Sequence, residues 1–292
     1  LDQLVRRLVF EPLEMTSSSY LWQERFEDMI AMPHGSDGEV LRKNRPQAGR
    51  GNAAASLHTT APDFARFMMA VMNGALLSDS TATAMLTSQI DVDSNLTWGL
   101  GIGLQDTEAG RAFWHWGDNT GYKAYTITYP GQGVGVVWFT NSENGQSLLE
   151  AMLAATVGGE HPAADWLGYE AYNSPTRAVR GVLVRTYEEQ GIDSAIAEYH
   201  QLKTTHPAQA FDEFLLNSLG YRLLRADRLQ DAIAVFELNV AEYPDASNPY
   251  DSLGEAYLAA GDTARAIVNY ERSVELNPDN ANGIAVLERI RG

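Results

Sequence analysis

The sequence has no cysteine and only three lysines among its 292 residues. Without cysteine the chain forms no disulfide, thiolate metal site or cysteine nucleophile, which leaves its cellular compartment open. No apolar run approaches the roughly 18 residues that a membrane-spanning helix needs, so we expect no transmembrane segment. Residues 1–20 carry no signal-peptide pattern.

Positive charge is scarce as well. There are 21 lysines and arginines against 38 aspartates and glutamates, which gives a formal net charge of −17. Because so acidic a surface repels phosphate backbones, we expect no nucleic-acid partner. Hydrophobic residues make up 45% of the chain and charged residues 20%, as in a globular protein. The simplest interpretation of the acidity is a well-solvated surface.

Several catalytic and cofactor signatures are missing. The six histidines have no short spacing that would bring two imidazoles to one metal ion, and we expect neither a metal nor a cofactor. No lysine follows a phosphate loop, and no Gly-x-Ser-x-Gly elbow occurs. Residues 98–104 (WGLGIGL) alternate glycine with large apolar residues. Leu104 stands where a dinucleotide fingerprint needs its last glycine and no helix follows, so we interpret this stretch as a strand.

The first part of the chain predicts helices separated by a long loop. Apolar residues recur at helical spacing until Pro12 stops the pattern. Residues 16–50 have no period and contain several glycines and prolines, which predicts a surface loop that borders a cleft. A helix over residues 60–73 follows, with Thr60 as its cap and Asp63 as the acid of a capping box.

From residue 98 the pattern changes to strands joined by short turns, which predicts an antiparallel sheet. A helix over residues 147–157 supplies apolar residues to pack on it. We therefore predict an α+β first domain over residues 1–160, an antiparallel sheet with packed helices, and then a linker over 161–175. The predicted strands are residues 98–104, 112–117, 122–129 and 133–140.

The remaining residues, 176–292, repeat with a period of 34. The equivalent positions are Leu219 and Leu253, Gly220 and Gly254, Ala232 and Ala266, Phe236 and Tyr270, and Pro244 and Pro278, each pair 34 residues apart. This period and pattern look like tetratricopeptide repeats. We predict an all-α solenoid of three helical hairpins. Two roles stay open for it: a groove for a protein or peptide partner, or a brace for the first domain.

The run from Phe113 to Tyr122 is the candidate functional region. It combines His115 with a glycine-containing turn between two predicted strands. Gly117, two residues after the histidine, would let a substrate lie against the strand. On its own, a histidine beside two tryptophans is more often a packed or loop-capping residue than a catalytic one.

Several stretches occur in an order that is typical of one enzyme family. They are residues 10–16 (FEPLEMT), 54–67 (AASLHTTAPDFARF), 98–104 (WGLGIGL) and 134–141 (VGVVWFTN), with His115-Trp116-Gly117 between the last two. In this order they resemble the segments PLGMT, GGLxSTAxDLARF, YGLGW and GVVVLTN of the serine β-lactamase-related hydrolases. This group holds class C β-lactamases, D-alanyl-D-alanine carboxypeptidases and related esterases. Residues 1–157 are similar to its C-terminal half, which implies a partial β-lactamase/transpeptidase-like fold.

The resemblance is incomplete at the nucleophile. The family uses the serine of a Ser-x-x-Lys motif, while that lysine and the tyrosine of Tyr-x-Asn handle its proton. No Ser-x-x-Lys and no Tyr-x-Asn occur here. Two explanations stay open: a fragment of a longer hydrolase, which we favour, or a pseudoenzyme whose repeats bind a partner. In both cases we expect this chain alone not to hydrolyse esters or β-lactams.

For the residues that are present, the resemblance implies roles beside such a serine. The serine would attack an amide or ester carbonyl of a small-molecule or peptide substrate, with esterase or peptidase activity favoured over β-lactamase activity. His115-Trp116-Gly117 would occupy the third active-site motif, Lys-Thr-Gly in β-lactamases and often His-x-Gly in their relatives. His115 would assist the hydrogen-bond network or hold a substrate carboxylate, and the backbone N–H of Asp118 would be one oxyanion donor. The candidates for lining the pocket, which fit plain turn chemistry equally, are Asn119, Thr120 and Tyr122. The family also implies a periplasmic or extracytoplasmic location.

Overall fold

The computed structural model describes residues 1–36, 38–41 and 51–291. The chain divides into two units, Leu1–Tyr172 and Asn173–Gly292, and each has its own core. Part of the predicted loop, residues 37 and 42–50, lies outside the described residues.

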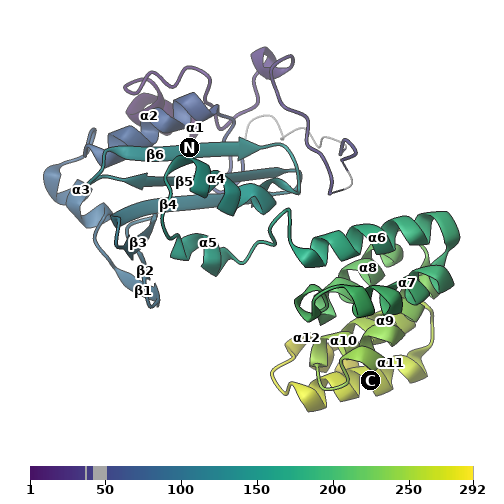
Figure 1. Cartoon of the computed structure of the whole chain (residues 1–292). Helices are drawn as coiled ribbons and strands as arrows, with labels where there is room; N and C mark the ends of the chain where they lie inside the picture. Colours follow the sequence, from purple (N-terminus) through teal and green to yellow (C-terminus); the bar gives the residue numbers. More distant parts are fainter. Residues whose placement is uncertain (37, 42–50, 292) are drawn as a thin grey trace. The chain divides into compact units, whose positions relative to one another are not determined.

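A six-stranded antiparallel sheet forms the centre of the first unit, with its strands in sequence order (Figure 1). Short turns join neighbouring strands, which is the local connectivity that the strand pattern predicts. The antiparallel sheet with packed helices is therefore confirmed for this unit. The strands are β1 (Ile90–Asp93), β2 (Leu96–Trp98), β3 (Gly103–Thr107), β4 (Gly110–Asn119), β5 (Tyr122–Tyr129) and β6 (Val134–Thr140).

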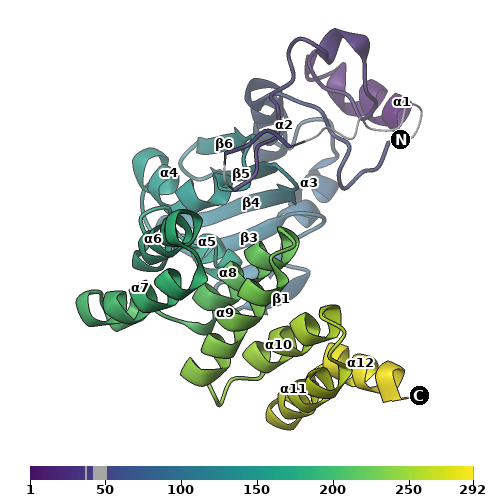
Figure 2. The same ribbon diagram turned by 90° about the vertical axis from the view of Figure 1, so that its right-hand side faces the viewer.

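Helices cover both faces of this sheet, so the first unit has three layers (Figure 2). The helical segments are α1 (Asp2–Val5), η1 (Arg6–Phe10), η2 (Glu24–Phe26), α2 (Ala61–Met72), α3 (Asp79–Met85), η3 (Gly145–Leu148), α4 (Leu149–Thr156) and α5 (Pro162–Leu167). α2 and α3 pack against a cluster that includes Leu104 and Phe113. α4 and α5 pack around Trp114 and Ile127 on the other face. Because side chains alternate along a strand, consecutive residues of β4 belong to different clusters.

The predicted helix over residues 60–73 is confirmed as α2. The Thr60 hydroxyl caps it by accepting a hydrogen bond from the backbone N–H of Asp63 at 3.4 Å. The carboxylate of Asp63 is buried and accepts hydrogen bonds from the backbone N–H of Ser17 at 2.8 Å and the hydroxyl of Ser18 at 2.9 Å. Asp63, which the sequence predicts as the acid of a capping box, therefore connects residues 17 and 18 to α2 through hydrogen bonds.

One strand prediction is wrong. Residues 98–104 do not form a single strand, because β2 and β3 include only its two ends and a turn lies between them. Gly101 has a φ of +75°, and a Cβ on Gly99 would lie 2.1 Å from the carbonyl oxygen of Met85. Only glycine fits both positions, so the alternating glycines serve a tight turn packed against α3.

The apolar stripe of the N-terminal helix faces outward. α1 continues directly into the π-helical turn η1. Leu1, Leu4 and Leu8 are 52%, 53% and 51% exposed, whereas Phe10 is buried. The helical prediction holds, but the stripe does not join the core of the first unit.

The described part of the irregular stretch packs beside the turn between β4 and β5. His34 forms backbone bridges with Val40 and with Ser142, which follows β6. The side chain of Asn141 donates to the carbonyl oxygen of Met32 at 2.7 Å. This loop supports the end of the sheet that carries the candidate residues.

The stretch predicted as a linker, residues 161–175, contains helix α5. Ala163 and Ala164 of α5 are buried against the sheet, so this part of the chain contributes to the core of the first unit. Gly168 ends α5 in the left-handed conformation, with φ of +65°.

The second unit is helical, as predicted, over its described residues. Its helices are α6 (Pro175–Gln190), α7 (Ile192–Thr205), η4 (Ala208–Ala210), α8 (Glu213–Arg225), α9 (Leu229–Glu242), α10 (Ser247–Ala259), α11 (Thr263–Leu276) and α12 (Ala281–Arg291). They share one core, in which the ring of Phe236 occupies the space above Gly220 and the ring of Tyr270 the space above Gly254. The assignment to tetratricopeptide repeats stays a prediction. No helix in the described part of the chain is both long and apolar enough to cross a membrane.

Candidate active site

The candidate residues lie where β4 extends beyond β3. The pairing of β4 with β3 ends at Trp114 opposite Gly103, whereas its pairing with β5 continues to Asn119 opposite Tyr122. Residues 115–119 therefore have β5 along one edge, and no strand of the described chain pairs with the other. A free strand edge offers backbone N–H and C=O groups to a ligand.

Alternation along β4 divides the candidate residues between the two faces of the sheet. Alternation assigns His115 and Gly117 to one face and Trp116 and Asp118 to the other, although the His115 ring itself stacks on Trp116. Contacts support this division, because Trp116 packs with the cluster under α4 and α5, and the Asp118 carboxylate accepts a hydrogen bond from Tyr169, which follows α5.

His115 is exposed and held by its neighbours. Its Nδ1 lies 2.8 Å from the carbonyl oxygen of Trp116. Its ring stacks on Trp116 with centroids 5.6 Å apart and meets the edge of Trp98 at 5.8 Å. Since a carbonyl oxygen only accepts hydrogen bonds, we assign the proton of the neutral ring to Nδ1. Nε2 is then the nitrogen with the free lone pair, available to an incoming ligand or proton.

Gly117 leaves a bare patch on the same face. A Cβ at this position would lie 3.4 Å from the Cβ of Ala124, close to an ordinary contact. By contrast, a Cβ on Gly103 would lie 2.6 Å from the Trp114 ring. Packing therefore demands glycine at 103 and much less so at 117.

Asp118 takes part in an ion-pair cluster on the opposite face. The ammonium group of Lys123 donates to Asp118 at 2.5 Å and to Glu143 at 2.6 Å, and it also donates to the carbonyl oxygen of Asn119 at 3.2 Å. The second oxygen of Glu143 accepts from the backbone N–H of Gly121 at 2.5 Å. Lys123 is only 6% exposed, so its charge is compensated by two carboxylates and a carbonyl.

The pKa values in this cluster are shifted by its contacts. Burial by itself would raise the pKa of Asp118, but the hydrogen bonds from Lys123 and Tyr169 outweigh it and hold that pKa below its usual value. Burial would lower the pKa of Lys123, but Asp118 and Glu143 outweigh it and raise that pKa. Burial and the hydrogen bond to Asp118 raise the pKa of Tyr169 to about 12. All three groups therefore keep their charge state at neutral pH.

The turn residues are fixed mainly by contacts with the N-terminal loop. The hydroxyl of Tyr122 donates to the carbonyl oxygen of Ala31 at 2.8 Å, which favours a turn-supporting role over pocket lining. Gly121 has a φ of +73°, and a Cβ there would lie 2.4 Å from Pro33. Asn119 and Thr120 are exposed beside this turn.

Sequence reasoning did not identify Lys123, Glu143, Gln146 and Tyr169. Gln146 is buried and donates to the carbonyl oxygen of Ala124 at 2.9 Å, on the strand next to Gly117. For Lys123 a signal existed: a two-residue turn places it opposite Asp118, and opposite charges at such positions attract. Glu143 and Tyr169 come from distant segments, and no local pattern points to them. Among the described residues, no group of three or more His, Asp and Glu side chains is placed to hold a metal ion.

Comparisons with solved structures find partial similarity. A penicillin binding protein from Bacillus halodurans is 19% identical, with a TM-score of 0.45 over 53% of this chain and 49% of that one. A D-stereospecific amidohydrolase from Streptomyces sp. is 16% identical, with a TM-score of 0.42 over 55% and 49%. The D-alanine carboxypeptidase AmpC from Burkholderia cenocepacia is 16% identical, with a TM-score of 0.41 over 48% and 50%. The chain thus spans about half the length of each of these proteins.

No curated protein sequence matches this chain. The sequence profile of the Beta-lactamase family matches residues 1–158, which is more than half of the 292 residues and includes the whole sheet with α2, α3 and α4. The chain therefore belongs to the Beta-lactamase family.

Proposed function

We propose that the first unit supplies one wall of the active site of a serine hydrolase that cleaves amide or ester bonds through an acyl-enzyme. The wall is the segment of β4 from His115 to Asn119. These 292 residues contain no Ser-x-x-Lys. The nucleophilic serine and its lysine would therefore belong to polypeptide outside them. The observation that carries this proposal is the free edge of β4, next to the bare face of Gly117. Membership in the Beta-lactamase family supports this reaction class.

In this reaction the serine oxygen adds to the substrate carbonyl while its proton passes to a neighbouring base. The C–N or C–O bond then breaks, the leaving amine or alcohol takes up that proton, and water hydrolyses the acyl-serine ester. Negative charge develops on the carbonyl oxygen in both steps, and a strand edge without a partner has backbone N–H groups to stabilise it. We assign the N–H of Asp118 to this role.

His115 would act from the exposed face of the same strand. With the Nδ1 proton donated to the Trp116 carbonyl, a neutral ring offers Nε2 as a hydrogen-bond acceptor, and a protonated ring offers it as a donor to a substrate carboxylate. A histidine at position 115 would hold an anion less firmly than the lysine of Lys-Thr-Gly does, which favours esterase or peptidase activity over β-lactamase activity. Asn119 and Thr120 would border the entrance, while Tyr122 would hold the turn in place through Ala31.

The first test is the activity of the chain as it stands. The purified 292-residue protein should hydrolyse neither nitrocefin nor p-nitrophenyl esters, because it lacks the nucleophile. Turnover that disappears in the variant His115→Ala would contradict the proposal that the serine lies outside this chain.

The second test uses a longer polypeptide that includes a Ser-x-x-Lys segment ahead of Leu1. In that protein, Gly117→Ala places a methyl group on the proposed substrate face and should lower kcat/KM about tenfold or more. Gly131→Ala is the matched control, because a Cβ at Gly131 meets open space in the turn after β5. If the two variants are equally active, or if no upstream Ser-x-x-Lys exists, the proposed active-site wall is wrong.

A second candidate function concerns the helical unit. We propose that residues 176–292 are tetratricopeptide-like repeats that bind a protein or peptide partner, in a chain whose first domain, residues 1–160, is then a non-catalytic scaffold. What favours it is that contacts recur at the sequence period. The hydroxyl of Tyr221 donates to Glu255 at 2.7 Å, and Arg222 donates to Glu188 at 2.9 Å, and each pair is 34 residues apart.

A peptide library screened against the full chain tests this second function. Binding at micromolar concentrations that survives His115→Ala and is lost when Gly220→Ala disturbs the repeat core would support a partner-binding unit. The absence of any binder at micromolar concentrations would count against it.

A further inference from the structure

The backbone of β4 is directed toward its free edge at Trp116 and at Asp118. In an antiparallel pair, the N–H and C=O groups of alternate residues point toward the partner strand and away from it. A two-residue turn joins Asn119 to Tyr122, which makes these two residues the hydrogen-bonded pair next to the turn. The backbone groups of Asp118 and Trp116 therefore point away from β5. The Trp116 carbonyl oxygen agrees with this, because the exposed ring of His115 reaches it at 2.8 Å.

One side chain from outside the sheet contacts these same two residues. The hydroxyl of Tyr169 donates to Oδ2 of Asp118 at 2.7 Å. Burial and this bond raise the pKa of Tyr169, and a hydrogen bond from the side chain of Trp116 opposes them. Tyr169 therefore links the side chains of the two residues whose backbone groups face the free edge.

The carboxylate of Asp118 is held from two directions. Lys123, on the neighbouring strand β5, donates to Oδ1 at 2.5 Å, and Tyr169 donates to Oδ2. The Asp118 side chain is 40% exposed, so with Lys123 alone its second oxygen could turn toward water. Two donors on one carboxylate fix the side chain, and a fixed side chain limits the movement of the backbone N–H of the same residue.

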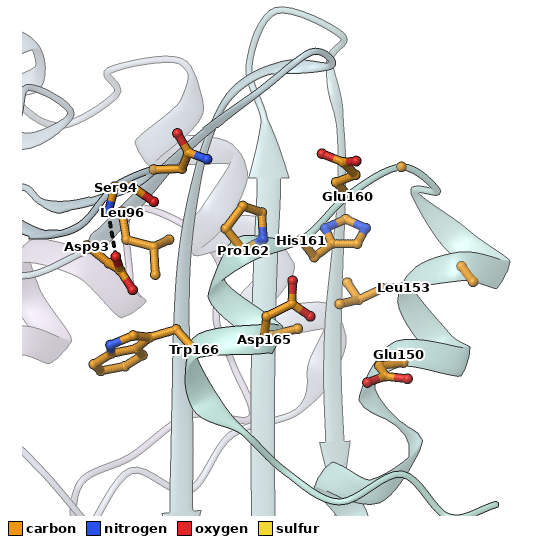
Figure 3. Close-up of a pocket in the computed structure, with 14 residues that line it drawn as sticks. Asp93, Ser94, Leu96, Glu150, Leu153, Glu160, His161, Pro162, Asp165 and Trp166 are labelled. Carbon is orange, nitrogen blue, oxygen red and sulfur yellow. Dashed lines mark hydrogen bonds between the residues drawn. The ribbon is translucent and has the colours of Figure 1, made fainter. Parts of the chain in front are cut away.

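Tyr169 is itself anchored on both sides. Ahead of it, the backbone N–H of the buried Ala163 in α5 donates to the side chain of Gln105 on β3 at 3.2 Å. Figure 3 shows this helix, which carries Trp166, lying against the strands. Beyond Tyr169, the backbone N–H of Tyr172 donates to a carbonyl oxygen of η3 at 2.9 Å. The hydroxyl is therefore presented to Asp118 by a segment that is fixed to the sheet unit.

We propose that Tyr169 is a positioning residue of the active-site wall: its hydroxyl holds Asp118 and Trp116, and so keeps the backbone N–H of Asp118 directed at the free edge of β4. The proposal rests on the proposed hydrolase function, in which this N–H stabilises the oxyanion. Tyr169 acts through Asp118 and touches neither substrate nor reacting atoms. It lies outside residues 1–158, so this support comes from a part of the chain that the family profile does not include.

The first measurement is made by NMR on the full 292-residue chain. Tyr169→Phe removes the hydroxyl and keeps the ring. Because the carboxylate loses a donor, the pKa of Asp118 should rise toward its ordinary value of 3.8, which the ¹³C shift of the carboxyl carbon follows. The ¹⁵N order parameter of the Asp118 amide should fall from about 0.85, the value of a rigid backbone, toward about 0.6.

The control removes an equivalent hydrogen bond elsewhere. The hydroxyl of Tyr187 donates to the carboxylate of Asp231 in the helical unit, also at 2.7 Å. Tyr187→Phe should change neither the pKa nor the order parameter of Asp118. Equal changes in the two variants, or no change in Tyr169→Phe, would overturn the positioning role.

The second measurement uses the longer polypeptide that carries Ser-x-x-Lys ahead of Leu1. There Tyr169→Phe should lower kcat about three- to tenfold and leave KM within about twofold, because an oxyanion donor acts on charge that develops in the transition state. The rate is expressed per active site, counted from the burst of acyl-enzyme, so that a loss of folded enzyme does not contribute. Tyr187→Phe should leave both constants unchanged.

The positioning role and the hydrolase function fail in different ways. If Gly117→Ala lowers kcat/KM and Tyr169→Phe leaves kcat unchanged, the role of Tyr169 is wrong and the active-site wall stands. If both variants are as active as the unchanged enzyme, the wall itself is wrong, and the role of Tyr169 is overturned with it.

Discussion

The two units use glycine in opposite ways. In the helical unit, Gly220 and Gly254 lie under aromatic rings, where a Cβ would be 2.4 and 3.0 Å from ring atoms of Phe236 and Tyr270. In the sheet unit, Gly117 has much less need of glycine for packing and faces outward from β4. Glycine in the helical unit thus marks close packing inside the fold, whereas Gly117 on β4 leaves a bare surface that packing does not require.

The largest effect on stability should come from Phe236, whose ring occupies the space above Gly220. Phe236 is fully buried, so Phe236→Ala should lower the free energy of unfolding of the helical unit by about 3–5 kcal/mol. Urea unfolding combined with hydrogen exchange in α8 and α9 measures this loss. The exposed residue Phe214, at 61%, is the control, and Phe214→Ala should cost less than about 1 kcal/mol. Equal losses would mean that the packing of Phe236 on Gly220 does not contribute to the stability of the core.

Alanine at Gly220 and alanine at Gly254 should change stability by different amounts. Gly220→Ala forces a methyl group into Phe236 and should destabilise by about 1–2 kcal/mol, even after the gain of about 1 kcal/mol that alanine brings to a helix. Gly254→Ala, with its larger clearance of 3.0 Å from Tyr270, should be close to neutral. Thermal unfolding of both variants measures the difference, and the reverse order would contradict the packing described here.

Lysine offers a second comparison between the units. Lys123 is 6% exposed and holds two carboxylates, whereas Lys203 is 40% exposed and pairs with Glu242. At about pH 7, Lys123→Met should cost about 1–2 kcal/mol of unfolding free energy and Lys203→Met at most about 0.5. Urea titrations of both variants measure the two costs. If Lys203→Met proves the costlier change, the Lys123 cluster does not stabilise the sheet.

The contribution of this cluster should also depend on pH in a defined direction. The pKa of Asp118 lies below its ordinary value of 3.8, so its stabilisation is present above that pH and is lost as the pH falls through the folded value. The pKa of Lys123 lies above its ordinary value of 10.5, so its stabilisation is present below that pH and is lost as the pH rises through the folded value. In Lys123→Met, the unfolding free energy should therefore depend less on pH than in the unchanged protein, both at low pH and at high pH.

The smallest effect on stability belongs to the candidate site. Gly117→Ala should change the free energy of unfolding by no more than about 0.5 kcal/mol, because the new Cβ is close to an ordinary contact with Ala124. Gly103→Ala on β3 is the matched comparison and should cost about 1–3 kcal/mol, because its Cβ would meet the buried Trp114 ring. A large loss in Gly117→Ala would instead make that glycine a packing residue.

Local patterns predicted the elements that depend on neighbours in the sequence. Helix α2 follows from Thr60 and Asp63, the β4–β5 and β5–β6 hairpins from alternation and turn residues, and the second unit from its 34-residue period. The placement of His115 on a strand was also within reach, although β4 continues to Asn119, two residues beyond the predicted strand end.

Elements that depend on distant contacts were missed or misread. The glycines at 99 and 101 look like strand residues until the Met85 carbonyl and the positive φ are known. Helix α5 has only six residues, too few to show a helical period, and its formation depends on the sheet against which Ala163 and Ala164 pack. The Lys123 cluster draws on Glu143 and Tyr169, 20 and 46 residues further along the chain, a separation at which no periodicity operates.

The division of β4 into two faces has a consequence for how such a protein diversifies. The contacts that hold the strand end, from Asp118 through Lys123 to Glu143, are on the side away from His115 and Gly117. Substitutions at positions 115 and 117 can therefore accumulate without removing the ion pairs that hold the end of the strand.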